Sequence, residues 1–168
     1  MAEEIINRVA QSKLKVIDLE DFYPSGKRLN LDIKDWLFEG LVLREKEFRS
    51  YVKTHDWTQY EASFVTITCS TDAIIPDWAF MLITTALQPH VKLSVVGNTE
   101  LLDTLLYKSL LDKLNLEDYQ DLPVIIKGCS NKPVPLNALN MITAHLMKVA
   151  KSIMYGEACS AVPLYKRT

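Results

Sequence analysis

The chain has 168 residues, of which 48% are hydrophobic and 24% charged, and its formal net charge is −2. This composition excludes a disordered chain, and the length favours one domain, residues 1–168, that needs no disulfides to hold its core. The small negative charge exerts no general attraction on nucleic acid or anionic lipid, so neither is expected as a partner. No apolar run is long enough to span a membrane and no signal-peptide core is present, so we expect a cytoplasmic protein.

The first part of the chain predicts two strands and one helix. The short apolar runs Leu14–Leu19 and Leu29–Ile33 predict strands, and the turn formers Pro, Ser and Gly lie between them. Arg44–Thr54 predicts a short amphipathic helix. The three tryptophans each follow Asp at equal spacing, but their flanking residues differ, so we do not interpret them as a repeat.

From Phe64 onward, strands and helices alternate. The predicted strands are Phe64–Cys69, Val91–Gly97 and Pro123–Lys127, and the predicted helices are Pro76–Leu87, Asn98–Leu114 and Leu136–Tyr155. Strands that alternate with helices of this length pair in parallel through right-handed crossovers. The expected fold class is therefore α/β, with a mainly parallel sheet of β-α-β-α-β-α order over 64–155. The N-terminal segment is expected to extend this sheet by strands and a helix.

Each of the three cysteines, Cys69, Cys129 and Cys159, is followed by Ser and, a few residues later, by Ile or Val and Pro. Cys69 ends one predicted strand and Cys129 follows another, so parallel pairing places both at the carboxyl edge, where open α/β sheets bind ligands. With the common strand order 2-1-3, these two strands would be neighbours and the two cysteines would lie side by side. Cys159 follows the last predicted helix and would reach that edge only if the tail folds back.

Polar residues accompany two of these cysteines in loops that lead into predicted helices. Free backbone N–H groups and the positive end of a helix dipole favour anions, thiolates included, and Lys127 acts in the same direction. The residues expected to contact an anion or to support the thiolates are Ser70, Asp72, Ser130 and Lys132.

Three interpretations of the cysteines stay open. As thiolate ligands, all three suit zinc or an iron–sulfur cluster, with Asp72, His55 or an exogenous species as the fourth ligand, although no C-x-x-C is present. As small buried residues beside turn-forming serines, they carry no chemistry. Thiol catalysis needs a base, and no histidine falls at the expected edge, so whether the protein is an enzyme stays open. Neither G-x-G-x-x-G nor a P-loop occurs to support a nucleotide site.

Four stretches carry a resemblance to a known family: IKDWLFEGLVLREKEFRSYVKTHDW (33–57), TCSTDAIIPDWAFML (68–82), KGCSNKPVP (127–135) and SIMYGEACSAVPLYKR (152–167). Over essentially the whole chain, the sequence resembles small bacterial proteins, mostly from Bacteroidetes, that are grouped as a domain of unknown function. The resemblance implies no established activity and no functional residues. It also implies neighbouring genes for iron–sulfur cluster assembly, which favours the thiolate interpretation.

The sequence therefore predicts a thiolate-based metal-binding or iron–sulfur-related protein, with Cys69, Cys129 and Cys159 at the carboxyl edge of the sheet. The alternative is a non-catalytic interaction or adaptor module with structural cysteines, which binds a protein partner or a second copy of itself.

Overall fold

The computed structural model describes residues 13–128 and 131–168. The chain divides into two compact units: unit 2 is Ser25–Asp103, and unit 1 combines the chain up to Pro24 with Thr104–Thr168. Each unit has its own sheet, with the order β1-β5-β6-β7 in unit 1 and β2-β3-β4 in unit 2. The α/β class and the mainly parallel pairing are thus confirmed, but the strands form two sheets where one was expected.

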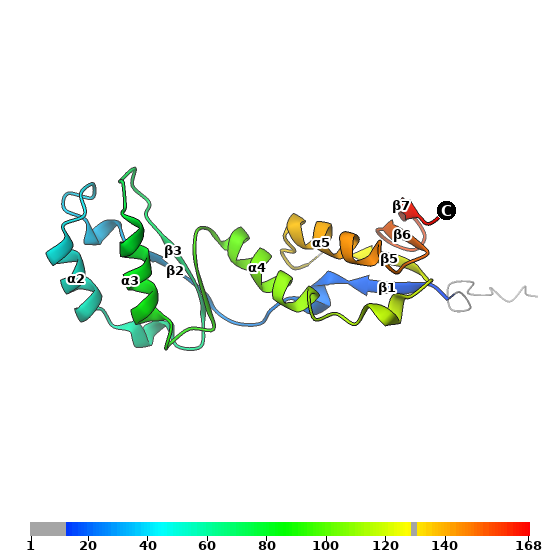
Figure 1. Cartoon of the computed structure of the whole chain (residues 1–168), viewed down its shortest axis with the longest axis horizontal. Helices are drawn as coiled ribbons and strands as arrows, with labels where there is room; N and C mark the ends of the chain where they lie inside the picture. Colours follow the sequence, from blue (N-terminus) through cyan, green and yellow to red (C-terminus); the bar gives the residue numbers. More distant parts are fainter. Residues whose placement is uncertain (1–12, 129–130) are drawn as a thin grey trace, which may run out of the picture. The chain divides into compact units, whose positions relative to one another are not determined.

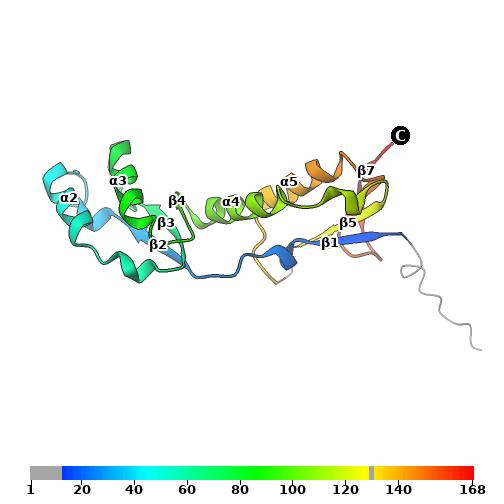
Figure 2. The same cartoon turned by 60° about the horizontal axis from the view of Figure 1, so that its bottom comes forward.

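Unit 2 is continuous in sequence and has the order β-α-β-α-β. Its elements are β2 (Arg28–Asp32), α2 (Glu45–Thr54), β3 (Phe64–Thr68), α3 (Asp77–Leu87) and β4 (Leu93–Val96). All three strands are parallel, with β3 in the centre. Because both connections step the same way across the sheet, right-handed crossovers place α2 and α3 on one face, as Figures 1 and 2 show.

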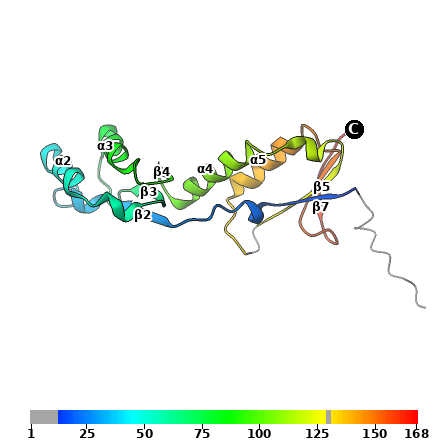
Figure 3. The same ribbon diagram turned by 90° about the horizontal axis from the view of Figure 1, so that it is seen from below.

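Unit 1 has the same arrangement, but its first strand is separated in sequence from the rest by unit 2. Its strands are β1 (Lys15–Asp18), β5 (Pro123–Lys127), β6 (Ser152–Tyr155) and β7 (Val162–Lys166), and its helices are the Thr104–Leu111 part of α4 (Thr99–Leu111) and α5 (Leu136–Leu146). β5 pairs in parallel with β1 and β6, and β7 is antiparallel to β6. Figure 3 shows α5 and the end of α4 on one side of β1 and β5. No helix of the described residues combines the length and apolar composition needed to cross a membrane.

The two units are internal repeats of one another. A position in β3 or β4 corresponds to the one 59 residues later, as the sheet registers Phe64–Leu93 and Pro123–Ser152 show. The backbone hydrogen bonds repeat as well: His90 O accepts from Ala62 N at 2.8 Å, and the equivalent Val149 O accepts from Asp121 N at 2.9 Å.

The repeat is clearest in the two cores. The buried positions with the same residue type in both units are Val65, Ile67, Ala79, Ile83 and Leu87 in unit 2, and Val124, Ile126, Ala138, Ile142 and Leu146 in unit 1. They occupy the central strand and the following helix, so in each unit the same side chains seal the helix against the sheet.

Short 3-10 turns also recur, each closed by a polar side chain just before it. The turns are η1 (Leu19–Phe22), η2 (Lys34–Trp36), η3 (Trp57–Tyr60) and η4 (Leu116–Tyr119). Asp18, Asp32, Asp56 and Asn115 each accept a hydrogen bond from the backbone N–H two residues later, at 3.0 to 3.2 Å. Such local capping fixes the direction in which the chain leaves each strand or helix.

The predicted helix Leu136–Tyr155 is too long. α5 ends at Leu146, and the following residues turn and form β6. Ile153 continues the helical spacing of the apolar residues, yet it lies in the sheet opposite Val124. Periodicity alone could not reveal this, because a buried strand position and a buried helix position are both apolar.

Equivalent core substitutions should loosen one unit at a time. Ile83→Ala and Ile142→Ala each remove a side chain that is 0% exposed, so we expect each to lower the free energy of unfolding by about 2–5 kcal/mol. Hydrogen exchange followed by mass spectrometry should show faster exchange in 64–96 for the first variant and in 123–155 for the second. The control Met81→Ala, at a 68% exposed position of α3, should change neither. Equal loosening of both units by either core variant would contradict two separate cores.

Candidate functional site

The segment that follows each central strand in sequence carries one of the cysteines of the predicted site, but the two segments belong to different units. Cys69 follows β3 in unit 2, whereas β5, in unit 1, leads towards Cys129. The expected adjacency of these strands is wrong: β3 pairs with β2 and β4, and β5 pairs with β1 and β6. The reason is that each central strand pairs with a different first strand, β3 with β2 and β5 with β1. No topological switch point therefore arises between β3 and β5. Cys129 and Ser130 lie outside the described residues.

Cys69 is a free, half-buried thiol. Its Sγ lies 3.3 Å from the hydroxyl of Thr71 and 3.7 Å from the carbonyl oxygen of the same residue. The thiol is thus held within its own loop.

Cys159 is a free, exposed thiol in the connection between β6 and β7. The sequence placed it at the end of a helix, near the opposite edge. Instead β6 runs parallel to β5, so the chain has already returned to the carboxyl edge of the unit 1 sheet when it reaches Cys159. The nearby Glu157 forms an ion pair with Lys127 at 2.7 Å, and this hydrogen bond raises the pKa of Lys127.

Two of the polar residues expected at an anion site, Ser70 and Lys132, bind the protein itself. Asp32 accepts a hydrogen bond from Ser70 N at 3.1 Å, and Lys132 Nζ donates to the backbone oxygen of Glu20 at 2.9 Å. Burial raises the pKa of Asp32, but hydrogen bonds from the hydroxyl of Ser70 and from backbone N–H groups outweigh this effect and hold its pKa below the usual value. Asp72 is exposed. The Asp32 carboxylate and the backbone carbonyl of Glu20 thus anchor these loops.

No metal centre is formed by the residues that the structure describes. Within 13–128 and 131–168, no group of three or more His, Cys, Asp or Glu side chains is placed to hold an ion. His55, considered as a further ligand, lies in an aromatic cluster, with ring centroids 4.7 Å from Trp57 and 5.1 Å from Trp36. Its Nε2 is 3.1 Å from both the Tyr60 hydroxyl and the Gln59 amide nitrogen. Because an amide N–H only donates, Nε2 is the acceptor and the ring is neutral.

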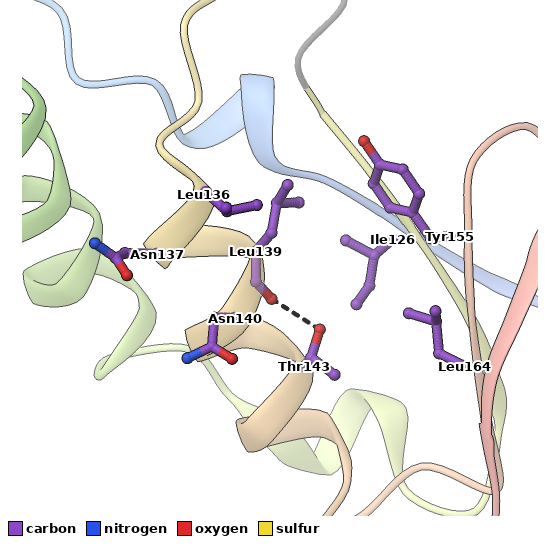
Figure 4. A pocket seen from close by; sticks show the side chains of 8 residues that line it. All are labelled: Ile126, Leu136, Asn137, Leu139, Asn140, Thr143, Tyr155 and Leu164. Atoms are coloured by element: carbon purple, nitrogen blue, oxygen red, sulfur yellow. Dashed lines mark hydrogen bonds between the residues drawn. The ribbon is translucent and has the colours of Figure 1, made fainter.

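Unit 1 has a hollow of about 540 Å³, called here the α5 hollow. Its lining residues are Ile126, Leu136, Asn137, Leu139, Asn140, Thr143, Tyr155 and Leu164. Figure 4 shows the leucines of α5 on one side and the side chains of the strands on the other. The Thr143 hydroxyl is satisfied by the Leu139 carbonyl at 2.7 Å. A hollow of this size falls in the range of small-molecule sites, roughly 300–1,000 Å³.

The α5 hollow is apolar, open and uncharged. Leu136 is 76% exposed and Leu164 is 51% exposed, so large apolar side chains face solvent at its rim. Among the described residues that line it, none is an acid, a base or a histidine. The polar groups on offer are two carboxamides, Asn137 and Asn140, and the phenol of Tyr155, whose hydroxyl lies 3.3 Å from the Gly128 carbonyl oxygen.

Unit 2 has a hollow of about 510 Å³ at the equivalent place. Ile67, Phe80 and Val96 line it where Ile126, Leu139 and Tyr155 line the α5 hollow. It also includes Cys69 and other polar groups of the loop after β3. The repeat has therefore kept a hollow at the carboxyl end of each central strand, while the chemistry of the lining differs.

Analysis of the sequence missed the α5 hollow. Its residues come from β5, α5, β6 and β7, of which the last two were not predicted. The available signal was Leu136, an apolar residue directly after Pro135 at the first helical position, where Asp77 stands in the other repeat. An acidic residue is favoured at this position, so a leucine there is unexpected and indicates a role other than starting the helix.

The fold and these hollows define a class: α/β proteins built from two repeats of a parallel β-α-β-α-β unit, with a hollow at the carboxyl end of each central strand. The chain belongs to the family described as protein of unknown function (DUF2480), whose model matches residues 3–167. This confirms the resemblance to a domain of unknown function. No curated protein and no solved structure matches the chain.

The half-buried His55 should make stability depend on pH. Burial lowers the pKa of His55 below its ordinary value, against the opposing effect of Asp56. The unfolded chain therefore binds the proton more readily, so the contribution of neutral His55 is complete above about pH 6.5 and is lost as the pH falls below that value. We expect the free energy of unfolding to decrease from pH 7.5 to pH 5.5, measured by urea denaturation.

His55→Gln should flatten that decrease, because glutamine has no proton to take up in this range. Tyr60→Phe serves as a control for the lost hydrogen bond, since it removes the hydroxyl partner and keeps the imidazole. An unchanged slope in His55→Gln would assign the pH dependence to another group.

Proposed function

We propose that the protein is a non-catalytic binding module whose ligand site is the α5 hollow. The observation that carries this proposal is an open hollow of ligand size whose rim exposes large apolar side chains and whose lining is uncharged. The ligand class is a neutral molecule with an aliphatic or aromatic body and at least one carbonyl, amide or hydroxyl group.

The absence of charge in the lining argues for a neutral ligand. Moving an ionised group out of water is costly unless a partner charge or several hydrogen bonds replace the water. The described lining offers carboxamides and hydroxyls instead, which donate and accept without charge. Asn137 and Asn140 project from successive turns of α5 (Figure 4), so they can orient one polar group of the ligand.

The apolar rim supplies the driving force. Covering Leu136 and Leu164 removes apolar surface from water at about 25 cal/mol per Å². Since β7 contributes Leu164 and unit 2 has no equivalent of β7, this wall belongs to unit 1 alone. The proposed specificity therefore depends on the strand that distinguishes the two repeats.

The neutral fluorophore N-phenyl-1-naphthylamine tests the site. We expect its fluorescence to rise on binding to the full chain and to saturate at one probe per chain. Leu136→Asp should weaken binding at least tenfold, because it places a charge at the rim. The unfolding free energy should change by less than about 0.5 kcal/mol, as for other surface substitutions, since Asp77 occupies the same helix position in the other repeat.

Met81→Asp is the matched control, since it adds the same charge at an exposed position of α3. It should leave probe binding unchanged. Equal weakening by both variants, or no binding by the wild type, would contradict the proposal.

A metal site at Cys69, Cys129 and Cys159 stays a prediction from the sequence, because Cys129 lies outside the described residues. The placement of β3 and β5 in separate sheets does not support it. We expect zinc and iron well below one per chain in protein purified without oxygen, measured by mass spectrometry of the elements. Stoichiometric metal that both Cys69→Ser and Cys129→Ser remove would reverse this conclusion.

A further inference from the structure

A second apolar surface lies in unit 2 and shares no residue with the α5 hollow. It consists of the hairpin 37–43 and the loop 70–75, and is called here the tip patch. Leu41 is 58% exposed, Val42 is 55% exposed and Ile74 is 94% exposed. Figure 1 shows the hairpin and the loop at the same end of this unit. Large aliphatic side chains that gather on a surface mark sites of interaction.

The hairpin presents its apolar residues through a closed turn. Phe38 and Val42 exchange both backbone hydrogen bonds, at 2.8 and 3.1 Å. Glu39 and Gly40 have positive φ angles of 52° and 70°, a conformation that is costly for a residue with a side chain. Arg44 covers Phe38, with its guanidinium carbon 3.2 Å from the ring centroid. The exposure of Leu41 and Val42 is thus fixed by the backbone.

The loop 70–75 lies beside this hairpin. A Cβ atom on Gly40 would lie 3.9 Å from the Thr71 side chain, which is ordinary van der Waals contact. Asp32 holds the loop through the N–H of Ser70. Both segments follow the carboxyl ends of β2 and β3, so they present their apolar residues at the same end of unit 2.

The charges around the tip patch are mostly negative. Glu39, Asp72 and Asp77 are exposed, and no ion pair involves them among the described residues. Arg44, which directly follows the hairpin, is engaged with Glu47 at 3.3 Å. An apolar centre with unpaired carboxylates around it is complementary to apolar and basic side chains together.

We propose that the tip patch docks a basic amphipathic segment of a partner protein. Aliphatic or aromatic side chains of the segment cover Leu41, Val42 and Ile74, and its lysines or arginines face Glu39, Asp72 and Asp77. This inference is independent of the ligand proposed for the α5 hollow.

A fluorescein-labelled 14-residue peptide of leucine and lysine, patterned as an amphipathic helix, tests the surface by fluorescence anisotropy with the full chain. A peptide with glutamate in place of lysine is the charge control. The double variant Leu41→Ser, Ile74→Ser should weaken binding of the basic peptide at least tenfold, and the acidic peptide should not bind. The double variant Asp72→Asn, Asp77→Asn should weaken binding several-fold and reduce its dependence on salt, because salt screens the attraction between these carboxylates and the lysines of the peptide.

Leu136→Asp serves as the control from unit 1 and should leave peptide binding unchanged. Equal binding of both peptides, or wild-type binding by the double serine variant, would overturn the proposal. Sedimentation velocity tests whether a second copy of the chain occupies the tip patch instead. A dimer that forms with increasing concentration and disappears in Ile74→Ser would assign the patch to such a copy and would equally overturn the proposal.

Discussion

Each unit depends on one strand, β3 or β5, that is hydrogen-bonded to a parallel neighbour on both sides. Parallel neighbours must be reached by crossovers, and right-handed crossovers that step in one direction send both helices to the same face. The core therefore forms between that face and the helices. The chain leaves every parallel strand at the same edge, so the loops and the hollows gather there, and the candidate sites follow from this pairing.

The two repeats keep the core and change the surface. Residues that seal the following helix against the central strand are the same in both, such as Ile83 and Ile142. At the rim, Asp77 in one repeat stands where Leu136 stands in the other. Core packing tolerates little change because interiors are close-packed, whereas exposed positions are free to take on different partners. On this basis the hollow of unit 1 is uncharged and apolar, whereas the surface of unit 2 at the equivalent helix start carries a carboxylate.

Local patterns predicted the elements but not their pairing. The helices α2 and α3 and the strand β5 were found within a residue or so of their ends, because apolar periodicity and Pro or Asp at helix starts are local signals. The division into two sheets was missed, since β1 pairs with β5 across the whole of unit 2, and no local signal encodes that. The repeat was missed because the positions that are identical in the two units hold residue types common in any core, such as Ala79 and Ala138. The repeated Cys-Ser pattern predicted one shared site instead, but Cys69 lies in unit 2 and Cys159 in unit 1.

The interruption of unit 1 by unit 2 has a consequence for synthesis on the ribosome. β1 emerges early, but β5, its pairing partner, is made only after all of Ser25–Asp103. Unit 2 can complete its sheet from continuous sequence, whereas the backbone N–H and C=O groups of β1 stay unpaired until β5 has been made. Since pairing of distant segments is slow and an open strand edge invites association with other chains, the order of folding is set from the start. We therefore expect the embedded unit to fold first and the enclosing unit to close last.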